Sequence, residues 1–288
     1  MCPAPTAVTM RDQPERLLLA GAMQTHPGRT RLLNEDVVAY VLPRPQDFFA
    51  GSGALAIVAD GMGGHAAGEV ASRLAADVIR RRYYELAGPV PDILAACFAA
   101  ANSAVYERGA ADPELNGMGT TCTVLAVRDG RIYLGHVGDS RAYILRGNRL
   151  RQISQDHSVV AELVRSGAIT AAEASKSPYR NVVLRALGIK SSVEPLIWSE
   201  GLPVLRGDSI VLCSDGLSDL VDDTEIADKV GRLPPAEACR ALIAAALAKG
   251  GRDNISLGVF TVGAGGADAD PTAVTRAVSI GHLAGDPK

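Results

Sequence analysis

Short apolar runs joined by two-residue turns fill the middle of the chain and constrain its fold most strongly. Asp129 and Gly130 lie between the β-rich runs TTCTVLAV and RIYLGHV, after Arg128, and Gly147 and Asn148 come after the run RAYIL and Arg146. Asp-Gly and Gly-Asn connections of this length are typical of β-hairpins, in which the strands are antiparallel. The pattern therefore predicts an antiparallel meander rather than a parallel sheet built from βαβ units.

Helical patterns lie on both sides of this region. Apolar residues keep a helical spacing from Glu69 to Leu86 and from Asp92 to Arg108, and a later helical block includes Pro235 to Lys249. Further buried strands are predicted in the runs ALAIVAD, SIVLCSD and NISLGVFTV. Strands in hairpins and helices in groups indicate an α+β protein whose helices pack outside antiparallel sheets.

Charge and hydropathy exclude several functions. The chain has 288 residues, with 29 basic and 32 acidic side chains, and this balance provides no overall field to attract nucleic acid or anionic lipid. Its longest nearly apolar stretches, such as Ala241 to Ala248, are shorter than the ~20 residues needed to cross a bilayer. We expect a cytoplasmic protein that binds neither nucleic acid nor membrane. Its five cysteines contain no CxxC pair and are expected to be reduced and buried.

Acidic residues stand at the ends of predicted strands, mostly beside glycine. They are Asp60, Asp139, Asp215 and Asp253, with Glu35 and Asp36 in the run RLLNED. A single Asp-Gly pair at a strand end is more often a turn than a ligand. Four such acids on separate strands instead indicate one shared site.

Convergence of these acids would require a cation, because carboxylates within a few ångströms of each other cannot all stay ionised. Oxygen ligands without thiolates favour Mg²⁺ or Mn²⁺ over zinc or copper. Two ions about 3.5 to 4 Å apart need a bridging carboxylate, and such a pair can activate water against a phosphorus centre. Asp60 is the candidate for that bridge.

Six motifs occur in an order that resembles the metal-dependent serine/threonine protein phosphatases, the PPM or type 2C family, and above all its bacterial members. They are RTRLLNED, VADGMGGHAAGE, GMGTT, GHVGDSR, LCSDGLSD and GRDNIS. The resemblance implies an αββα sandwich, in which helices cover both outer faces of two antiparallel sheets. It implies a phosphatase domain over residues 20–262, after an N-terminal extension of residues 1–19. Residues 263–288 lack a periodic apolar face and are expected to form a flexible tail.

The resemblance also implies the ligands of two Mn²⁺ or Mg²⁺ ions. Asp60 matches the carboxylate that bridges the ions, and the carbonyl of Gly61 matches a ligand of the first ion. Asp215 and Asp253 match the remaining carboxylate ligands of the second ion.

Further acids match outer positions of the family site. Asp139 and Asp219, together with Asp215, match a third-metal site of bacterial members. Glu35 and Asp36 match acids that orient metal-bound water molecules.

Two residues match catalytic positions. Arg31 lies four residues before Glu35, at the position of the phosphate-binding arginine, and this spacing favours it over the nearby Arg29. A planar guanidinium can hold two phosphoryl oxygens at once. His65 matches the residue proposed to protonate the departing alkoxide, for which imidazole has a suitable pKa. His157 is expected to make structural hydrogen bonds. The segment from there to Gly188 matches a flap for which we hypothesise a role in substrate gating.

The resemblance implies hydrolysis of phosphoserine and phosphothreonine by direct attack of a metal-bridging hydroxide. Its implied partners are phosphorylated proteins and a bacterial serine/threonine kinase whose action it reverses, and a monomer is expected. The alternatives are a phosphoprotein-binding pseudophosphatase, a partner-switching regulator and a hydrolase of small phosphorylated metabolites. Every expected acid is present, which favours an active enzyme over a pseudophosphatase.

Overall fold

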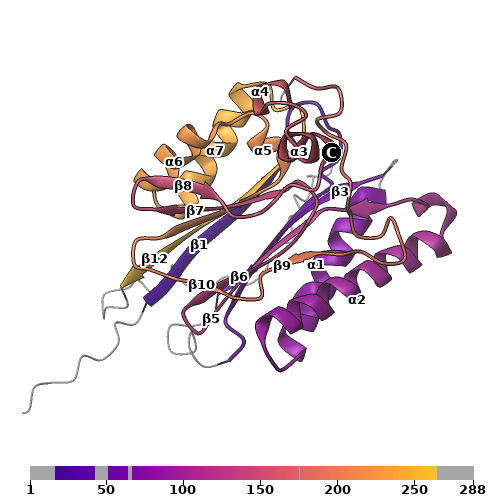
Figure 1. Ribbon diagram of the computed structural model, residues 1–288, viewed down its shortest axis with the longest axis horizontal. Coiled ribbons are helices and arrows are strands. Elements are labelled where there is room, and N and C mark those ends of the chain that lie inside the picture. The colour runs from indigo at the N-terminus through magenta and orange to yellow at the C-terminus, as the bar shows by residue number, and fades with distance from the viewer. Residues whose placement is uncertain (1–16, 43–50, 64–66, 175, 265–288) are drawn as a thin grey trace, which may run out of the picture.

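Two antiparallel sheets lie face to face in the computed structural model, and helices cover the outer face of each sheet (Figure 1). The structure describes residues 17–42, 51–63, 67–174 and 176–264. The αββα sandwich expected from the sequence is confirmed. Gly263 and Ala264, the first two residues of the expected tail, belong to a strand, and the rest of the tail, residues 265–288, lies outside the described residues.

The first sheet has five strands. Its order is β1 (Leu17–His26), β12 (Ile255–Ala264), β11 (Ser209–Cys213), β7 (Arg141–Arg146) and β8 (Arg149–Gln152). The main path of the second sheet is β10 (Leu202–Pro203), β6 (Arg131–Val137), β5 (Cys122–Arg128), β3 (Ala54–Met62) and β2 (Asp36–Val41). Two short strands extend it, β4 (Gly119–Thr120) beside β3 and β9 (Leu196–Ile197) beside β6.

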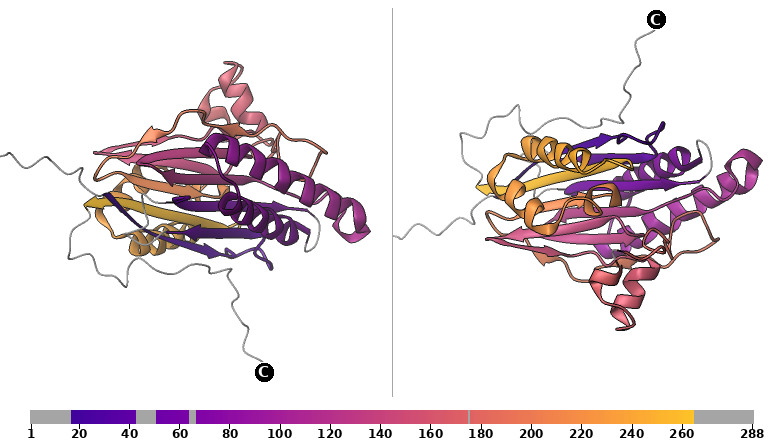
Figure 2. Two further views of the ribbon diagram at one scale, coloured as in Figure 1. Left: turned by 90° about the horizontal axis from the view of Figure 1, so that it is seen from below. Right: turned by 90° about the horizontal axis from the view of Figure 1, so that it is seen from above.

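The helices form two outer layers. Helices α1 (Ala67–Glu85) and α2 (Val90–Ala111) cover the second sheet, followed by a 3₁₀ turn at Pro113–Leu115. Helices α5 (Asp215–Ser218), α6 (Asp223–Arg232) and α7 (Pro235–Ala248) cover the first sheet. Helices α1 and α2 lie in front when the molecule is seen from below, and helices α6 and α7 lie in front when it is seen from above (Figure 2). The short helices α3 (Val159–Arg165) and α4 (Ala171–Ala174) belong to the predicted flap.

Strand β3 is buried on both of its faces. Leu55 and Ile57 pack against the helices, whereas Ala56 and Val58 pack between the two sheets. Successive strand residues point to opposite faces, so a strand buried on both faces needs a continuous apolar run. The run ALAIVAD meets this requirement, and the predicted strand at this position is confirmed.

The two predicted hairpins form, but the continuous meander is wrong. Asp129 and Gly130 both have positive φ angles, 52° and 71°, as the turn between β5 and β6 requires. The hairpin of β7 and β8 belongs to the other sheet. The chain crosses between the sheets at Gly138, whose φ is 110°. Turn residues determine pairing within a hairpin and carry no information about which sheet the next hairpin joins.

Strand β1 was not expected as a strand. It pairs with β12 along its full length, from Leu17 opposite Ala264 to His26 opposite Ile255. Residues 17–19 of the predicted N-terminal extension therefore belong to the first sheet.

The cysteine and membrane predictions can be compared with the part of the chain that is described. Its four cysteines, Cys97, Cys122, Cys213 and Cys239, are free and buried, as expected. No helix in these ranges has the length and apolar character needed to span a bilayer.

Candidate metal and phosphate site

Strand register brings the predicted acids to one end of the sandwich. Asp36 begins β2 and lies opposite Asp60, near the end of β3. In the first sheet, Asp215 follows the end of β11 and begins α5, and Asp253 lies two residues before β12. Asp139 lies in the connection from β6 to β7, where the chain passes from one sheet to the other. The acids thus come from both sheets.

The electrostatics show that these carboxylates influence one another. Burial raises the pKa of Asp60 well above its usual range, and the charges of Asp36, Asp215, Asp139 and Asp253 raise it further. Burial likewise raises the pKa of Asp215, with smaller contributions from neighbouring acids that include Asp219. Repulsion of this kind is expected where several carboxylates share one desolvated site.

Two acids carry buried oxygens without a hydrogen-bond partner. Ser214 donates a hydrogen bond of 2.8 Å to Oδ2 of Asp36, but Oδ1 of Asp36 has no partner, and burial raises the pKa of this carboxyl to about 6. Oε1 of Glu35 is also unpartnered, and burial raises the pKa of its carboxyl. Buried polar atoms are normally satisfied, so a hydrogen-bond donor or a cation is expected beside these two oxygens.

The donor set fits a hard divalent cation. Its side-chain donors are carboxylate oxygens, which Mg²⁺ and Mn²⁺ prefer. Within the described ranges, no three His, Cys, Asp or Glu side chains already converge as a finished ligand set. The acids therefore influence one another electrostatically, but their side chains are not arranged as a complete metal-coordination shell.

The backbone around Asp60 is held on both sides. The N–H of Asp60 donates to Oγ1 of Thr121 at 3.1 Å, and its carbonyl accepts from the N–H of Thr121 and from Oγ1 of Thr120, both at 2.9 Å. The hydrogen bonds of these two threonines thus hold the backbone of the acid predicted to bridge two ions.

Close backbone packing explains the glycine at position 61. Its N–H donates to the carbonyl of Glu35 at 3.1 Å, and a Cβ atom there would lie 2.1 Å from the carbonyl oxygen of Gly68. A Cβ at Gly68 would lie 2.5 Å from Oε1 of Glu35. The start of α1 can approach β3 and Glu35 only because both positions lack side chains.

Arg31 lies beside the acids. Its Nη2 atom is 2.9 Å from Oδ2 of Asp253, and its side chain is 51% exposed. The competing Arg29 points elsewhere, because its Nε donates to the carbonyl of Leu247 at the end of α7 at 3.0 Å. The structure thus places Arg31, and not Arg29, beside a predicted metal ligand. His65 lies outside the described residues.

Asn254 was not predicted, although it lies in the motif GRDNIS. Its side-chain oxygen accepts from the N–H of Glu35 at 2.9 Å, and its Nδ2 donates to the carbonyls of Pro27 and Leu33 at 3.0 and 2.9 Å. The Asn254 side chain therefore fastens the loop that carries Arg31 to the segment that carries Asp253.

A cavity of about 790 Å³ is bordered by both the acids and the flap. Its lining includes Asp139, Asp215, Asp219 and Asp253 together with the flap residues Arg165, Arg180 and Asn181. Burial raises the pKa of Asp139 to about 6 and also raises that of Asp219. The cavity is large enough to admit a phosphorylated side chain next to the acids.

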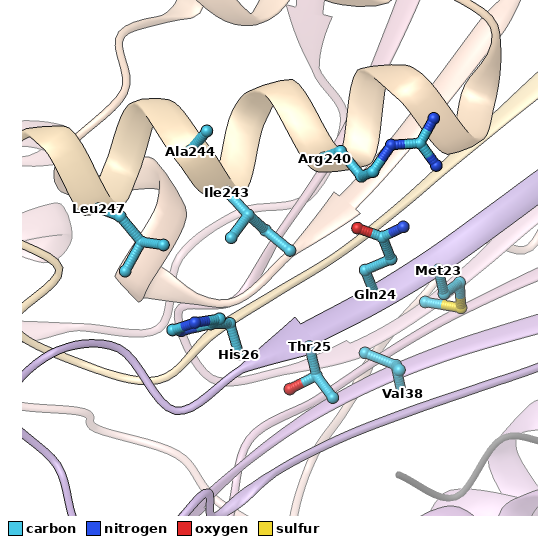
Figure 3. A pocket seen from close by; sticks show the side chains of 9 residues that line it. All are labelled: Met23, Gln24, Thr25, His26, Val38, Arg240, Ile243, Ala244 and Leu247. Carbon is cyan, nitrogen blue, oxygen red and sulfur yellow. The ribbon is translucent and has the colours of Figure 1, made fainter. Parts of the chain in front are cut away.

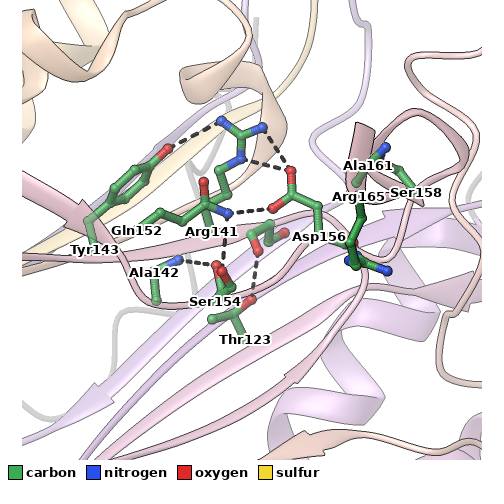
Figure 4. Close-up of polar contacts among 11 residues, drawn as sticks. Thr123, Arg141, Ala142, Tyr143, Gln152, Ser154, Asp156, Ser158, Ala161 and Arg165 are labelled. Carbon is green, nitrogen blue, oxygen red and sulfur yellow. Dashed lines mark hydrogen bonds and ion pairs between the residues drawn. The ribbon is translucent and has the colours of Figure 1, made fainter. Parts of the chain in front are cut away.

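An ion pair holds the start of the flap (Figure 4). Nε and Nη2 of Arg141 donate to Oδ2 of Asp156 at 2.9 and 2.8 Å, and Gln152 donates to the other oxygen at 2.7 Å. Beside it, the N–H of His157 donates to the carbonyl of Gly138 at 2.7 Å, and the N–H of Gly138 donates to Nδ1 of His157 at 3.2 Å. These contacts attach the flap to the crossing that contains Asp139.

A second, smaller hollow of about 360 Å³ lies between β1 and α7 (Figure 3). Its lining is largely apolar, with His26 and Arg240 among the polar residues, and includes no carboxylate. It is therefore chemically distinct from the acid site.

The fold and the site define a sandwich protein with a carboxylate-rich centre at one end of its two sheets. Residues 42–250, more than half of the chain, match the family model described as "Protein phosphatase 2C". The chain belongs to the protein phosphatase 2C family.

Two bacterial phosphatases are among the proteins similar to this chain. The chain is 40% identical to the serine/threonine protein phosphatase PstP of Mycobacterium tuberculosis over 85% of this chain, but it spans only 45% of that relative. It is 36% identical to the serine/threonine phosphatase stp of Listeria welshimeri, over 70% of this chain and 82% of the relative. The catalytic domain of PstP, solved in complex with two manganese ions, matches with a TM-score of 0.74 and 38% identity, over 86% of this chain and 99% of that chain.

Proposed function

We propose that the chain is a metal-dependent phosphatase that hydrolyses phosphoserine and phosphothreonine in proteins. The observation that carries this proposal is the set of mutually repelling acids around Asp60, with unpartnered oxygens beside the half-exposed guanidinium of Arg31. The names of the relatives support the same activity. Every acid predicted for the site is present, so a phosphoprotein-binding pseudophosphatase is not favoured.

In this proposal, Asp60, the carbonyl of Gly61, Asp215 and Asp253 hold two Mn²⁺ or Mg²⁺ ions. Such ions, when bound, neutralise the acids and lower the pKa of a water molecule that attacks phosphorus. The manganese found in the PstP catalytic domain supports this choice of ion. Asp139 and Asp219, together with Asp215, form a third site, where burial raises the pKa of all three carboxyls.

The remaining residues position the reactants. Glu35 and Asp36 orient water through their buried oxygens. Arg31 holds two phosphoryl oxygens, so that phosphorus faces the attacking water. The new bond joins the water oxygen to phosphorus, and the bond from phosphorus to the seryl or threonyl oxygen breaks. His65 gives a proton to that oxygen, which releases the unmodified side chain and inorganic phosphate.

The proposal also covers the source of the substrates, the working state of the enzyme and the role of the flap. A serine/threonine kinase supplies the phosphorylated proteins, the enzyme acts as a monomer in the cytoplasm, and the flap discriminates among substrates. Arg180 and Asn181 of the flap line the cavity next to Asp219, which supports the last point. Deleting residues 171–177 is expected to change peptide preference while hydrolysis of a small aryl phosphate continues.

Phosphate release from a phosphothreonine peptide tests the activity. Wild-type protein with Mn²⁺ is compared with wild type in chelator, with Asp215→Asn, and with the control Asp228→Asn, which changes an exposed acid on α6. Chelator and Asp215→Asn are each expected to lower the rate by more than the roughly 100-fold of an outer-shell change, while Asp228→Asn retains it. Peptide binding without turnover by wild type would favour the pseudophosphatase instead.

A further inference from the structure

Two exposed leucines follow Arg31 directly. Leu32 is 99% exposed and Leu33 is 47% exposed. Burying a leucine side chain is worth roughly 1.5 to 3 kcal/mol, so full exposure of Leu32 contributes nothing to folding by this route. Because isolated apolar residues are common on protein surfaces, the exposure gains meaning only from its location.

The loop that carries the leucines is fastened at several points. Asn254 binds the carbonyls of Pro27 and Leu33 and the N–H of Glu35. Asn34 donates to Oγ1 of Thr25 at 2.8 Å. Leu32 is therefore presented to solvent by a hydrogen-bonded loop, next to a guanidinium that lies 2.9 Å from a site acid.

More than half of the exposed large apolar side chains in the described part of the chain lie on two segments, the loop of Arg31 and the flap. Nine large apolar residues are exposed in the described ranges, and five lie on this loop or on flap residues 179–184. These five are Leu32, Leu33, Tyr179, Val182 and Leu184. Arg180 and Asn181, within the flap segment, line the same cavity as Asp253, the partner of Arg31. The loop that carries Arg31 and the flap thus both present exposed apolar side chains.

We infer that Leu32 and Leu33 contact an apolar side chain next to the phosphorylated residue of the substrate protein and thereby determine sequence preference. The inference rests on the proposed phosphatase activity. It is argued from position in the chain, because the Cα atom of Leu32 lies about 3.8 Å from that of Arg31, whose guanidinium is proposed to hold the phosphoryl group. A substrate residue adjacent to the phosphorylated one is displaced by the same distance along its own chain.

Peptide kinetics test this specificity. Phosphothreonine peptides of one length carry either leucine or serine on both sides of the phosphorylated residue, and phosphate release is measured with Mn²⁺. Each kcat/KM is divided by the value of the same variant for a small aryl phosphate. The proteins are wild type, Leu32→Ser/Leu33→Ser, the conservative Leu32→Met/Leu33→Met, and Leu205→Ser. The last variant removes a leucine that is 47% exposed and lies neither on the loop of Arg31 nor on the flap.

Wild type, the methionine variant and Leu205→Ser are expected to prefer the leucine peptide by about 10-fold, as for modest apolar contacts. The double serine variant is expected to treat the peptides within about 2-fold of each other. Equal wild-type rates for the two peptides, or a preference that survives in the serine variant, would overturn the inference and leave the phosphatase activity intact. A wild-type dimer that the serine variant dissociates would also overturn it, because the leucines would then cover a second copy. Failure of wild type to release phosphate from any peptide would instead contradict the proposed function.

Discussion

Asp36 and Asp60 lie directly opposite each other on the antiparallel strands β2 and β3. The pair is flanked by Ser214, which binds one oxygen of Asp36, and by Thr121, which binds the backbone of Asp60. Burial raises the pKa of both carboxyls. The same contacts that build the second sheet therefore force two carboxylates together in a desolvated place.

Removing the charge of Asp36 is expected to stabilise the metal-free protein at neutral pH. Its pKa is about 6 in the folded state, against 3.8 ordinarily, so folding is penalised increasingly as pH rises through this window. In chelator at pH 7, Asp36→Asn is expected to melt higher than wild type by about 3 °C or more, with the difference shrinking toward pH 4. Scanning calorimetry in chelator measures both proteins. The pKa values of His136 and His157 are lowered in both proteins, so their contribution to the pH dependence of melting cancels when the two proteins are compared. A melting difference independent of pH would contradict this account.

Replacing Arg31 with lysine is expected to lower kcat/KM for a phosphopeptide by roughly 100-fold, because an ammonium group cannot hold two phosphoryl oxygens in one plane. The inhibition constant of inorganic phosphate is expected to rise in parallel. Arg29→Lys is the matched control, since that side chain binds the end of α7. Steady-state kinetics that show equal losses for both variants would remove the phosphate-binding role from Arg31.

Gly61→Ala is expected to destabilise the protein by about 1 to 3 kcal/mol, because its Cβ would lie 2.1 Å from the carbonyl oxygen of Gly68. The displaced backbone would also weaken Mn²⁺ binding. Gly263→Ala, in β12, is the control, since no atom lies within 4 Å of its added Cβ. Urea unfolding should separate the two variants, and equal midpoints would show that the close approach at Gly61 is not required.

Breaking the pair of Arg141 and Asp156 is expected to cost about 3 kcal/mol, because the largely buried Asp156 carboxylate would keep its hydrogen bond from Gln152 but lose its cationic partner. The exposed pair of Asp228 and Arg232 provides the comparison, with an expected cost of about 0.5 kcal/mol. Arg141→Met and Arg232→Met are compared by urea unfolding. An equal cost for the two variants would mean that Arg141 does not anchor the flap.

The sequence predicted the elements whose patterns are local. The run ALAIVAD became β3 because a strand buried on both faces must be apolar throughout, and Asp129-Gly130 formed the expected hairpin turn. Strand β1 could not be predicted in this way, because it depends on pairing with β12 at the other end of the chain. The assignment of the two hairpins to different sheets likewise depends on contacts far apart in sequence.

The site, like the fold, has features that local sequence predicts and features that depend on contacts between distant residues. The acids could be listed from their positions at strand ends, whereas their mutual repulsion depends on register between strands. Asn254 and Thr121 escaped prediction because a polar residue beside a strand has no distinctive pattern. Their importance lies in hydrogen bonds to Glu35, Leu33 and Asp60, which become visible only in three dimensions.

The most direct test of the central claim is a calorimetric titration of metal-free protein with Mn²⁺, followed by phosphate release from the same samples. Wild type is predicted to bind at least two ions and to hydrolyse a phosphothreonine peptide. Asp60→Asn is predicted to lose binding of at least one ion together with turnover, because a bridging carboxylate serves both ions. Unchanged stoichiometry, affinity and turnover in Asp60→Asn would contradict the claim that Asp60 is the centre of the site.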